Sequence, residues 1–161
     1  MNRLIFHPNL CVGCFACELA CKGEHQLPSG IRWIQVERVE RIAGEGKPQL
    51  SFQLRVCQHC ESAPCVPACP VGAIFQKKGG FILLDGEKCN GCQECLKACP
   101  WRAIAFDSAR QTASKCNLCV HQAKPRCVTY CPSGALTLAL PFDSGLGLPS
   151  SEKKSEGNNA Q

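Results

Sequence analysis

Alternating apolar and polar side chains mark one pair of strands in this chain. Residues 50–56 (LSFQLRV) alternate over their whole length, which is typical of a half-buried strand. Residues 31–39 (IRWIQVERV) are expected to pair with them, with AGEGKPQ as the connecting turn. A further apolar run, Phe81–Leu84, follows two glycines. These patterns predict short hairpins.

Large side chains are too scarce for an ordinary core. Only 6% of the 161 residues are aromatic, and the chain has a single Met and a single Tyr. A domain of this length normally buries more Phe, Leu, Ile and Val. About one residue in ten is instead a cysteine, 16 in all. We therefore expect something other than side-chain packing to hold the fold together.

The 16 cysteines form four groups with one repeated spacing. Each group opens with a gap of two residues and closes with a gap of three, while only the middle gap varies. The groups are Cys11, Cys14, Cys17, Cys21; Cys57, Cys60, Cys65, Cys69; Cys89, Cys92, Cys95, Cys99; and Cys116, Cys119, Cys127, Cys131. No cysteine is left over. Such a repeat indicates duplication of one structural unit and is hard to reconcile with an irregular disulfide network.

Three of the closing cysteines are followed by a proline and a similar apolar tail. The tails read PVGAI at 70–74, PWRAI at 100–104 and PSGAL at 132–136, whereas Lys22 follows Cys21. Proline is favoured in the first turn of a helix, where its missing N–H has no partner to lose. Short helices are therefore expected after all four closing cysteines.

Three chemistries compete for these thiols. The spacing C-x2-C-x2-C-x3-C-P is the signature of bacterial ferredoxins, which hold 4Fe–4S clusters. Zinc ribbons use two separated CxxC pairs per ion, and four ions would also consume every thiol, but they do not require three thiols on one loop. A secreted disulfide scaffold would carry an export signal, and MNRLIFHPNLC contains none. Iron–sulfur clusters are favoured, with zinc as the main alternative.

Charge and hydropathy argue against two classes of partner. The net charge is +5, but Lys and Arg are scattered and no aromatic residues interleave with them, so nucleic-acid binding is not indicated. The longest apolar stretches, such as residues 135–140, are too short to cross a bilayer. Together with the expectation of reduced thiols, this predicts a cytoplasmic chain without membrane insertion.

The four motifs, in this order and with a lengthened fourth loop, resemble those of four-cluster iron–sulfur (beta) subunits of molybdenum and tungsten pterin oxidoreductases. These are the dimethyl-sulfoxide-reductase family and its relatives, and similar chains accompany formate dehydrogenases, hydrogenases and tungsten aldehyde oxidoreductases of anaerobic metabolism. The resemblance covers roughly residues 4–140. It implies an α+β fold of two bacterial ferredoxin-like halves, related by a pseudo-twofold axis, with short hairpins and short helices around four 4Fe–4S clusters.

The resemblance also implies a crossed pattern of cluster ligands, in which each closing cysteine binds the cluster of another motif. The sets are Cys11, Cys14, Cys17 and Cys131 for cluster 1; Cys116, Cys119, Cys127 and Cys21 for cluster 2; Cys57, Cys60, Cys65 and Cys99 for cluster 3; and Cys89, Cys92, Cys95 and Cys69 for cluster 4. Gly13 and Gly91 would leave room for backbone N–H groups to bond cluster sulfur.

The same resemblance divides the chain into three parts. Residues 1–140 are expected to form the four-cluster domain, with the first and fourth motifs in one half and the second and third in the other. Residues 22–56 would be an inserted β-hairpin region. Residues 141–161 are rich in Ser, Gly, Asn and charge, which is typical of a solvated tail or of an arm that orders on a partner.

No residue of this chain is expected to be catalytic. A 4Fe–4S cluster with four thiolates offers substrate no open iron, and the chain has no GxGxxG, no P-loop and no Ser/His/Asp constellation. The expected function is relay of single electrons between a catalytic molybdenum- or tungsten-pterin (or hydrogenase) subunit and a flavin- or NAD(H)-dependent or other redox partner. Self-stacking into longer assemblies is a further expectation. A free-standing polyferredoxin carrier or maturation helper is the alternative, and a zinc-binding interaction module is a weaker one.

Several residues beside the cysteines have two interpretations. His59, inside CQHC, is expected to lie behind a cluster or on the surface. Trp101 would shield a cluster or simply pack. Four cations near the cluster loops would raise cluster potentials, bind an acidic partner or remain ordinary solvated charge: Lys88, Lys97, Arg102 and Lys115.

Overall fold

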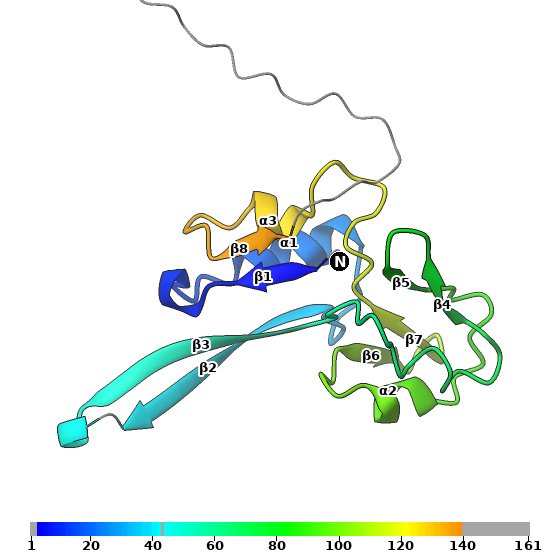
Figure 1. Cartoon of the computed structure of the whole chain (residues 1–161), viewed down its shortest axis with the longest axis horizontal. Helices are drawn as coiled ribbons and strands as arrows, with labels where there is room; N and C mark the ends of the chain where they lie inside the picture. Colours follow the sequence, from blue (N-terminus) through cyan, green and yellow to red (C-terminus); the bar gives the residue numbers. More distant parts are fainter. Residues whose placement is uncertain (1–2, 43, 140–161) are drawn as a thin grey trace, which may run out of the picture.

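The computed structural model describes residues 3–42 and 44–139, so the tail predicted at 141–161 lies outside the described residues. Its elements are β1 (Leu4–Phe6), η1 (Pro8–Leu10), α1 (Ala16–Glu24), β2 (Ile34–Ile42), η2 (Gly44–Gly46), β3 (Pro48–Val56), β4 (Ile74–Lys77), β5 (Phe81–Leu84), α2 (Glu94–Ala98), β6 (Ile104–Asp107), β7 (Thr112–Lys115), α3 (Arg126–Thr129) and β8 (Leu136–Leu138). The strands form two-stranded antiparallel sheets, as Figure 1 shows. This is a small mixed fold of helices and strands. Within the described part, no helix has the length and apolar character needed to cross a membrane.

The first and last described strands pair with each other. β1 and β8 are antiparallel, with Leu4 opposite Leu138, and they lie side by side in Figure 1. Helix α1 packs against α3, and the carboxylate of Glu24 accepts a 2.8 Å bond from the guanidinium of Arg126. This closure brings the first and fourth cysteine groups together, although they lie at opposite ends of the sequence.

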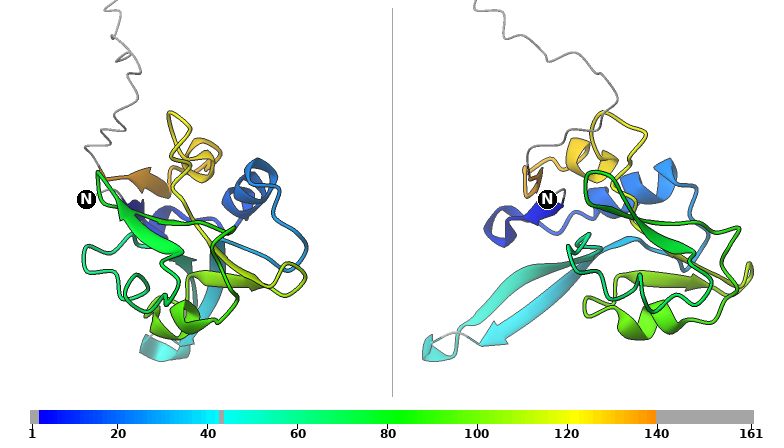
Figure 2. Two further views of the ribbon diagram at one scale, coloured as in Figure 1. Left: turned by 90° about the vertical axis from the view of Figure 1, so that its right-hand side faces the viewer. Right: turned by 45° about the vertical axis from the view of Figure 1, so that its right-hand side comes forward.

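The predicted strand pair around residues 31–39 and 50–56 is confirmed, although the first strand starts three residues later than predicted and the second starts two residues earlier. β2 and β3 pair over nine residues each, from Ile34 opposite Val56 to Ile42 opposite Pro48. Ile34 and Val56 are buried at the base, whereas Ile42 is 81% exposed near the far end. Figures 1 and 2 show this hairpin, the β2–β3 arm (residues 34–56), projecting from the body. Only its base meets the core, which is why the apolar alternation is clearest there.

The hairpin predicted around Phe81–Leu84 is also present. β4 and β5 are antiparallel, with Ile74 opposite Leu84, and β6 pairs with β7 in the same manner. Each of these two hairpins starts within five residues of a Cys-Pro pair. The tails of the cysteine motifs therefore lead into strands.

The helices predicted after Cys69, Cys99 and Cys131 are wrong. In all three tails a turn forms instead, in which the third residue after the cysteine donates its N–H to the cysteine carbonyl oxygen at 3.2–3.3 Å. That residue has a positive φ in each case: Gly72 at 64°, Arg102 at 47° and Gly134 at 68°. A left-handed residue ends a helical turn, so the proline begins one turn and no more.

The helices that do form contain or precede the closing cysteines. α1 begins at Ala16 and already includes Cys21, so it starts earlier than predicted. α2 and α3 end shortly before Cys99 and Cys131. Each helix presents cysteine side chains of its motif to the interior, since Cys17, Cys95 and Cys127 are all buried.

Thiols make up much of what is buried in the described residues. Eight of the 16 cysteines are buried: Cys17, Cys21, Cys57, Cys65, Cys95, Cys116, Cys119 and Cys127. All of them except Cys119 pack with apolar side chains in two core clusters, one around Ile34 and Leu118 and the other around Ile74 and Ile82. The interior of the described residues therefore contains sulfur as well as hydrocarbon.

Candidate metal centres

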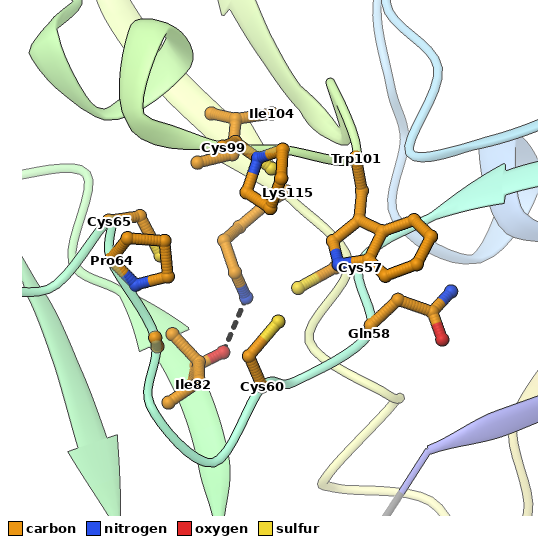
Figure 3. Close-up of a pocket in the computed structure, with 12 residues that line it drawn as sticks. Cys57, Gln58, Cys60, Pro64, Cys65, Ile82, Cys99, Trp101, Ile104 and Lys115 are labelled. Carbon is orange, nitrogen blue, oxygen red and sulfur yellow. Dashed lines mark hydrogen bonds between the residues drawn. The ribbon is translucent and has the colours of Figure 1, made fainter.

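Three cysteines of the second group share a cavity with the closing cysteine of the third. Cys57, Cys60 and Cys65 lie on the loop after β3, and Cys99 follows α2. Figure 3 shows their side chains around a cavity of about 320 Å³, part of which is open to solvent. Apolar groups complete the wall, among them Ile82, Ile104 and the half-exposed ring of Trp101. We call Cys57, Cys60, Cys65 and Cys99 the Cys57 site.

Two more cavities are lined by four cysteines in the same crossed arrangement. Cys89, Cys92 and Cys95 share a cavity of about 280 Å³ with Cys69, and this set is the Cys89 site. Cys11, Cys14 and Cys17 share one of about 310 Å³ with Cys131, and this set is the Cys11 site. In both sites one thiol reaches the surface, because Cys92 and Cys14 are exposed.

The remaining four cysteines are all buried, where α1 packs against α3. Burial raises the pKa of Cys21, and the charges of three nearby thiols raise it further. These thiols belong to Cys116, Cys127 and Cys119. Burial also raises the pKa of Cys116 to about 12. Such thiols carry protons at neutral pH without metal, so metal binding must release those protons. We call Cys21, Cys116, Cys119 and Cys127 the Cys116 site.

The repeated tail behind the closing cysteines supplies hydrogen bonds to sulfur. Ala73 N–H donates to Cys69 Sγ at 3.2 Å, and Ala103 N–H donates to Cys99 Sγ at 3.5 Å. Burial raises the pKa of Cys69, but the N–H groups of residues 71–74 outweigh it and lower that pKa. Because such bonds favour the thiolate, the tail prepares the closing cysteine to bind metal.

Two glycines hold the cysteine loops close to their neighbours. Gly91 has a φ of +75°, and a Cβ placed on it would lie 2.6 Å from the backbone oxygen of Gln111. Gly13 has a φ of +65°, and its Cβ would lie 2.3 Å from the ring of Phe52 in the β2–β3 arm. A side chain is excluded at Gly91 by backbone, whereas at Gly13 it is excluded by a ring that can move.

The sequence did not predict that His25 lies within hydrogen-bond distance of a cysteine sulfur. His25 Nε2 lies 3.3 Å from Cys119 Sγ, and its ring packs on Trp33 with centroids 4.5 Å apart. One sequence signal was its position four residues after Cys21, which places both near one face at the end of α1. The other candidate, His59, is buried and accepts a 3.0 Å bond at Nδ1 from the N–H of Ile82. His59 is therefore an interior residue and not a surface one.

The four cations predicted near the cluster loops differ sharply in exposure. The side chains of Lys88 and Lys97 are 65% and 72% exposed and pair with nearby carboxylates. Arg102 is exposed as well. Lys115 is only 3% exposed and lines the cavity of the Cys57 site. Three of the four are thus solvated, and one is interior.

The donor sets fit iron–sulfur clusters. Among residues 3–42 and 44–139, no three His, Cys, Asp or Glu side chains converge closely enough to hold a single metal ion. In three sets the four thiols instead line one shared cavity that is partly open to solvent. Four thiolates around such a space suit a cubane, whose irons occupy separate corners, better than one tetrahedral zinc with bonds of about 2.3 Å.

Comparison with known proteins agrees with these donor sets. Residues 48–140 match the family described as "4Fe-4S dicluster domain", and residues 8–73 match a second family of the same description. Two dicluster domains account for the four 4Fe–4S clusters that the cysteine count predicts, so that prediction is confirmed.

Relatives of known name support the same conclusion. The chain is 39% identical to the B subunit of tetrathionate reductase from Salmonella typhimurium, over 78% of this chain and 52% of that protein. It is 37% identical to the thiosulfate reductase electron transfer subunit of Salmonella typhi, over 78% and 69%. It is 34% identical to the B polypeptide of polysulfide reductase from Wolinella succinogenes, over 83% and 73%. The chain thus spans only about half the length of the first relative. By these matches the predicted resemblance is confirmed, and the chain belongs to the 4Fe–4S dicluster family, among the iron–sulfur subunits typified by these reductase proteins.

Proposed function

We propose that this chain is a non-catalytic electron-transfer subunit that relays single electrons between a catalytic molybdenum- or tungsten-pterin subunit and a second redox partner. The observation that carries the proposal is a set of three cavities, each lined by four cysteines from two motifs. The mutual influence of the thiols of Cys21, Cys116, Cys119 and Cys127 supports a fourth set of the same kind. Bound 4Fe–4S clusters supply one-electron redox chemistry. With every thiol engaged, no iron is left open for substrate.

The ligand sets proposed are the four sites named above. Cluster 1 belongs to the Cys11 site, cluster 2 to the Cys116 site, cluster 3 to the Cys57 site and cluster 4 to the Cys89 site. The cavities and the mutual influence of the thiols support this assignment. The pairing of β1 with β8 supports a half built from the first and fourth motifs, and β4–β7 with α2 would form the other half, related to it by a pseudo-twofold axis.

Electrostatic influences between thiols of different sites, together with shared core packing, support one order along the wire. Burial and neighbouring thiols, Cys17 among them, raise the pKa of Cys127, so the Cys11 and Cys116 sites adjoin. Besides burial, the charge of Cys57 likewise raises the pKa of Cys116, so the Cys116 and Cys57 sites also adjoin. Cys65 and Cys95 share one core cluster, which joins the Cys57 and Cys89 sites. The proposed order is Cys11 site, Cys116 site, Cys57 site, Cys89 site.

Solvent exposure of the cysteine ligands differs between the middle of this wire and its two ends. All four thiols of the Cys116 site are buried, while Cys14 and Cys92 at the two terminal sites are exposed. Burial keeps water from the cluster of the Cys116 site, and exposure of one ligand brings each outer cluster within reach of a partner. Electrons would therefore enter at one terminal site and leave at the other.

The two ends differ in surface chemistry, which supports different partners. Around Cys14 the surface carries apolar side chains: Leu10, Val12, Phe15 and Leu19 are 51%, 65%, 43% and 69% exposed. Near Cys92 lies the charged pair Glu94–Lys97. Permanent interfaces are more apolar than transient ones. We propose that the catalytic subunit docks at the Cys11 site and the second partner at the Cys89 site.

Leu19→Asp is expected to weaken binding of the catalytic subunit by at least about tenfold, because it places a charge in an apolar interface. Leu19 is 69% exposed on α1, so the fold and the iron content should stay unchanged. The affinity can be measured by titrating one labelled subunit with the other. The matched control is Ile42→Asp, on an apolar residue of the β2–β3 arm that is even more exposed, at 81%. Loss of binding in the control, with none in Leu19→Asp, would move the docking surface to the arm.

The proposed function is tested by purifying the chain anaerobically from its native host. We expect a stable complex with a pterin-containing subunit, in which dithionite-reduced clusters are reoxidised by that subunit's substrate. Tetrathionate, thiosulfate and polysulfide are the first substrates to try, because relatives are subunits of the corresponding reductases. A lone monomer without pterin would favour the free-standing polyferredoxin and contradict the proposal.

Three finer expectations stay predictions that the same purification would address. The second partner would be a flavin- or NAD(H)-dependent subunit or a hydrogenase, the complex would stack into larger assemblies, and the location would be cytoplasmic, where thiols stay reduced. Mass measurement of the intact complex would identify the partners and the stoichiometry together.

A further inference from the structure

One buried cation lies where the two inner sites meet. Lys115 ends β7, and its side chain is directed into the interior, with 3% of the residue exposed. Buried lysines are rare unless something pairs with them. Lys115 therefore needs an electrostatic partner.

Two hydrogen bonds of Lys115 are made to backbone oxygens. Its Nζ donates to the carbonyl oxygen of Ile82, as Figure 3 shows, and to that of Cys116 at 2.8 Å. None of the ion pairs among the described residues includes Lys115. Two neutral carbonyls orient the ammonium but leave its charge without a counter-ion, which is costly in the interior.

Thiols of both inner sites surround this charge. Lys115 lines the cavity of the Cys57 site and directly precedes Cys116 in the sequence. Burial raises the pKa of Cys57, and the nearby Lys115 ammonium is the strongest influence against that rise. Burial raises the pKa of Cys116 as well, and the Lys115 charge lowers it against that larger rise. Once these thiols bind clusters as thiolates, they would supply the missing counter-ion.

The other buried titratable groups of the described residues add no positive charge between the Cys57 and Cys116 sites. His59 is buried there, and its Nδ1 accepts a 3.0 Å bond from the N–H of Ile82, so that nitrogen carries no proton and the ring is neutral. Asp107, the buried acid of the described part, lies at the other end of the β6–β7 hairpin, where it accepts N–H bonds from Ala109 and Arg110. Lys115 alone among these supplies positive charge between the inner sites.

We infer that Lys115 raises the reduction potentials of the two inner clusters, at the Cys57 and Cys116 sites, relative to the two outer ones. Reduction adds negative charge, and a fixed ammonium at short range in a low-dielectric interior stabilises the reduced state. The inference rests on the proposed ligand sets. Its consequence is a wire whose middle holds an electron more firmly than its ends.

The test is a redox titration of the full-length, anaerobically reconstituted chain, followed by electron paramagnetic resonance. Lys115→Met removes the charge with little change of shape, Lys115→Gln is a second neutral variant, and Lys115→Arg keeps the charge. Lys97→Met removes an exposed lysine beside the outer Cys89 site and is the matched control. Iron, sulfide and circular dichroism are measured on every variant.

Two of the four midpoint potentials should fall in Lys115→Met. We expect the equilibrium constant for reduction to drop at least about tenfold at each, which is about 59 mV for a one-electron couple. Lys115→Arg and Lys97→Met should stay near the wild type. Four unchanged potentials, or an equal shift of all four, would overturn the inference. Loss of clusters from both neutral variants would also overturn it, because the lysine would then be structural.

The same data separate this inference from the proposed ligand sets. If the wild type itself holds fewer than four clusters, the ligand sets are wrong. If it holds four clusters and Lys115→Met leaves every potential in place, the ligand sets stand and only the role of Lys115 fails.

Discussion

Extraction of the clusters should unfold most of this chain. Half of its cysteines are buried. Three of the four cysteine sets line cavities that bound clusters would fill. The hairpins β4–β5 and β6–β7 have only four residues per strand, which is too short to be stable alone. In small proteins organised around metal, binding energy becomes folding energy.

The measurement is thermal unfolding followed by circular dichroism, before and after iron is chelated under reducing, anaerobic conditions. The metal-free chain should show no cooperative transition, and addition of iron and sulfide should restore one. A cooperative transition in metal-free protein, near the holoprotein's melting temperature, would mean that side-chain packing suffices.

Gly91→Ala should cost the chain one cluster. The new methyl group would meet the backbone oxygen of Gln111 at 2.6 Å, in a left-handed conformation that non-glycine residues rarely adopt. Backbone strain of this kind costs about 1–3 kcal/mol, and relief of the clash must displace the loop that carries Cys89 and Cys92. Iron and sulfide should therefore fall by about a quarter, the share of one 4Fe–4S cluster.

Two matched glycines serve as controls for Gly91→Ala. Gly86→Ala should leave the iron content unchanged, because nothing lies within 4 Å of its Cβ position and its φ is not left-handed. Gly13→Ala should have an intermediate effect, since the ring of Phe52 can move aside. Full iron content in Gly91→Ala would show that the Cys89 loop tolerates displacement, and the account of that loop would be wrong.

The tails of the cysteine motifs illustrate where sequence reasoning fails. Proline after Cys69, Cys99 and Cys131 predicted helices, because proline suits a first helical turn. The structure has turns, since the third residue after each cysteine takes a positive φ and the chain bends into a strand. Gly72 and Gly134 were a signal for this turn. The N–H bonds to cysteine sulfur that accompany it depend on the folded site and could not be foreseen.

The base of the β2–β3 arm was predictable because local alternation meets one core face there. The burial of Lys115 was not. In β7, Ala113 and Lys115 are both buried, as a strand requires of alternate residues, but four residues are too few to identify the inner face. The contact between His25 and Cys119 joins α1 to the fourth cysteine group and likewise depends on long-range closure.

The central claim, that four clusters organise this chain and carry its electrons, is tested most directly by counting them. Iron and sulfide analysis of the anaerobically loaded chain should give about 16 of each, four per cluster. Full reduction should give a paramagnetic signal that integrates to about four spins, one per cluster. Eight irons or fewer in fully loaded protein, or no signal after reduction of a fully loaded sample, would contradict the account.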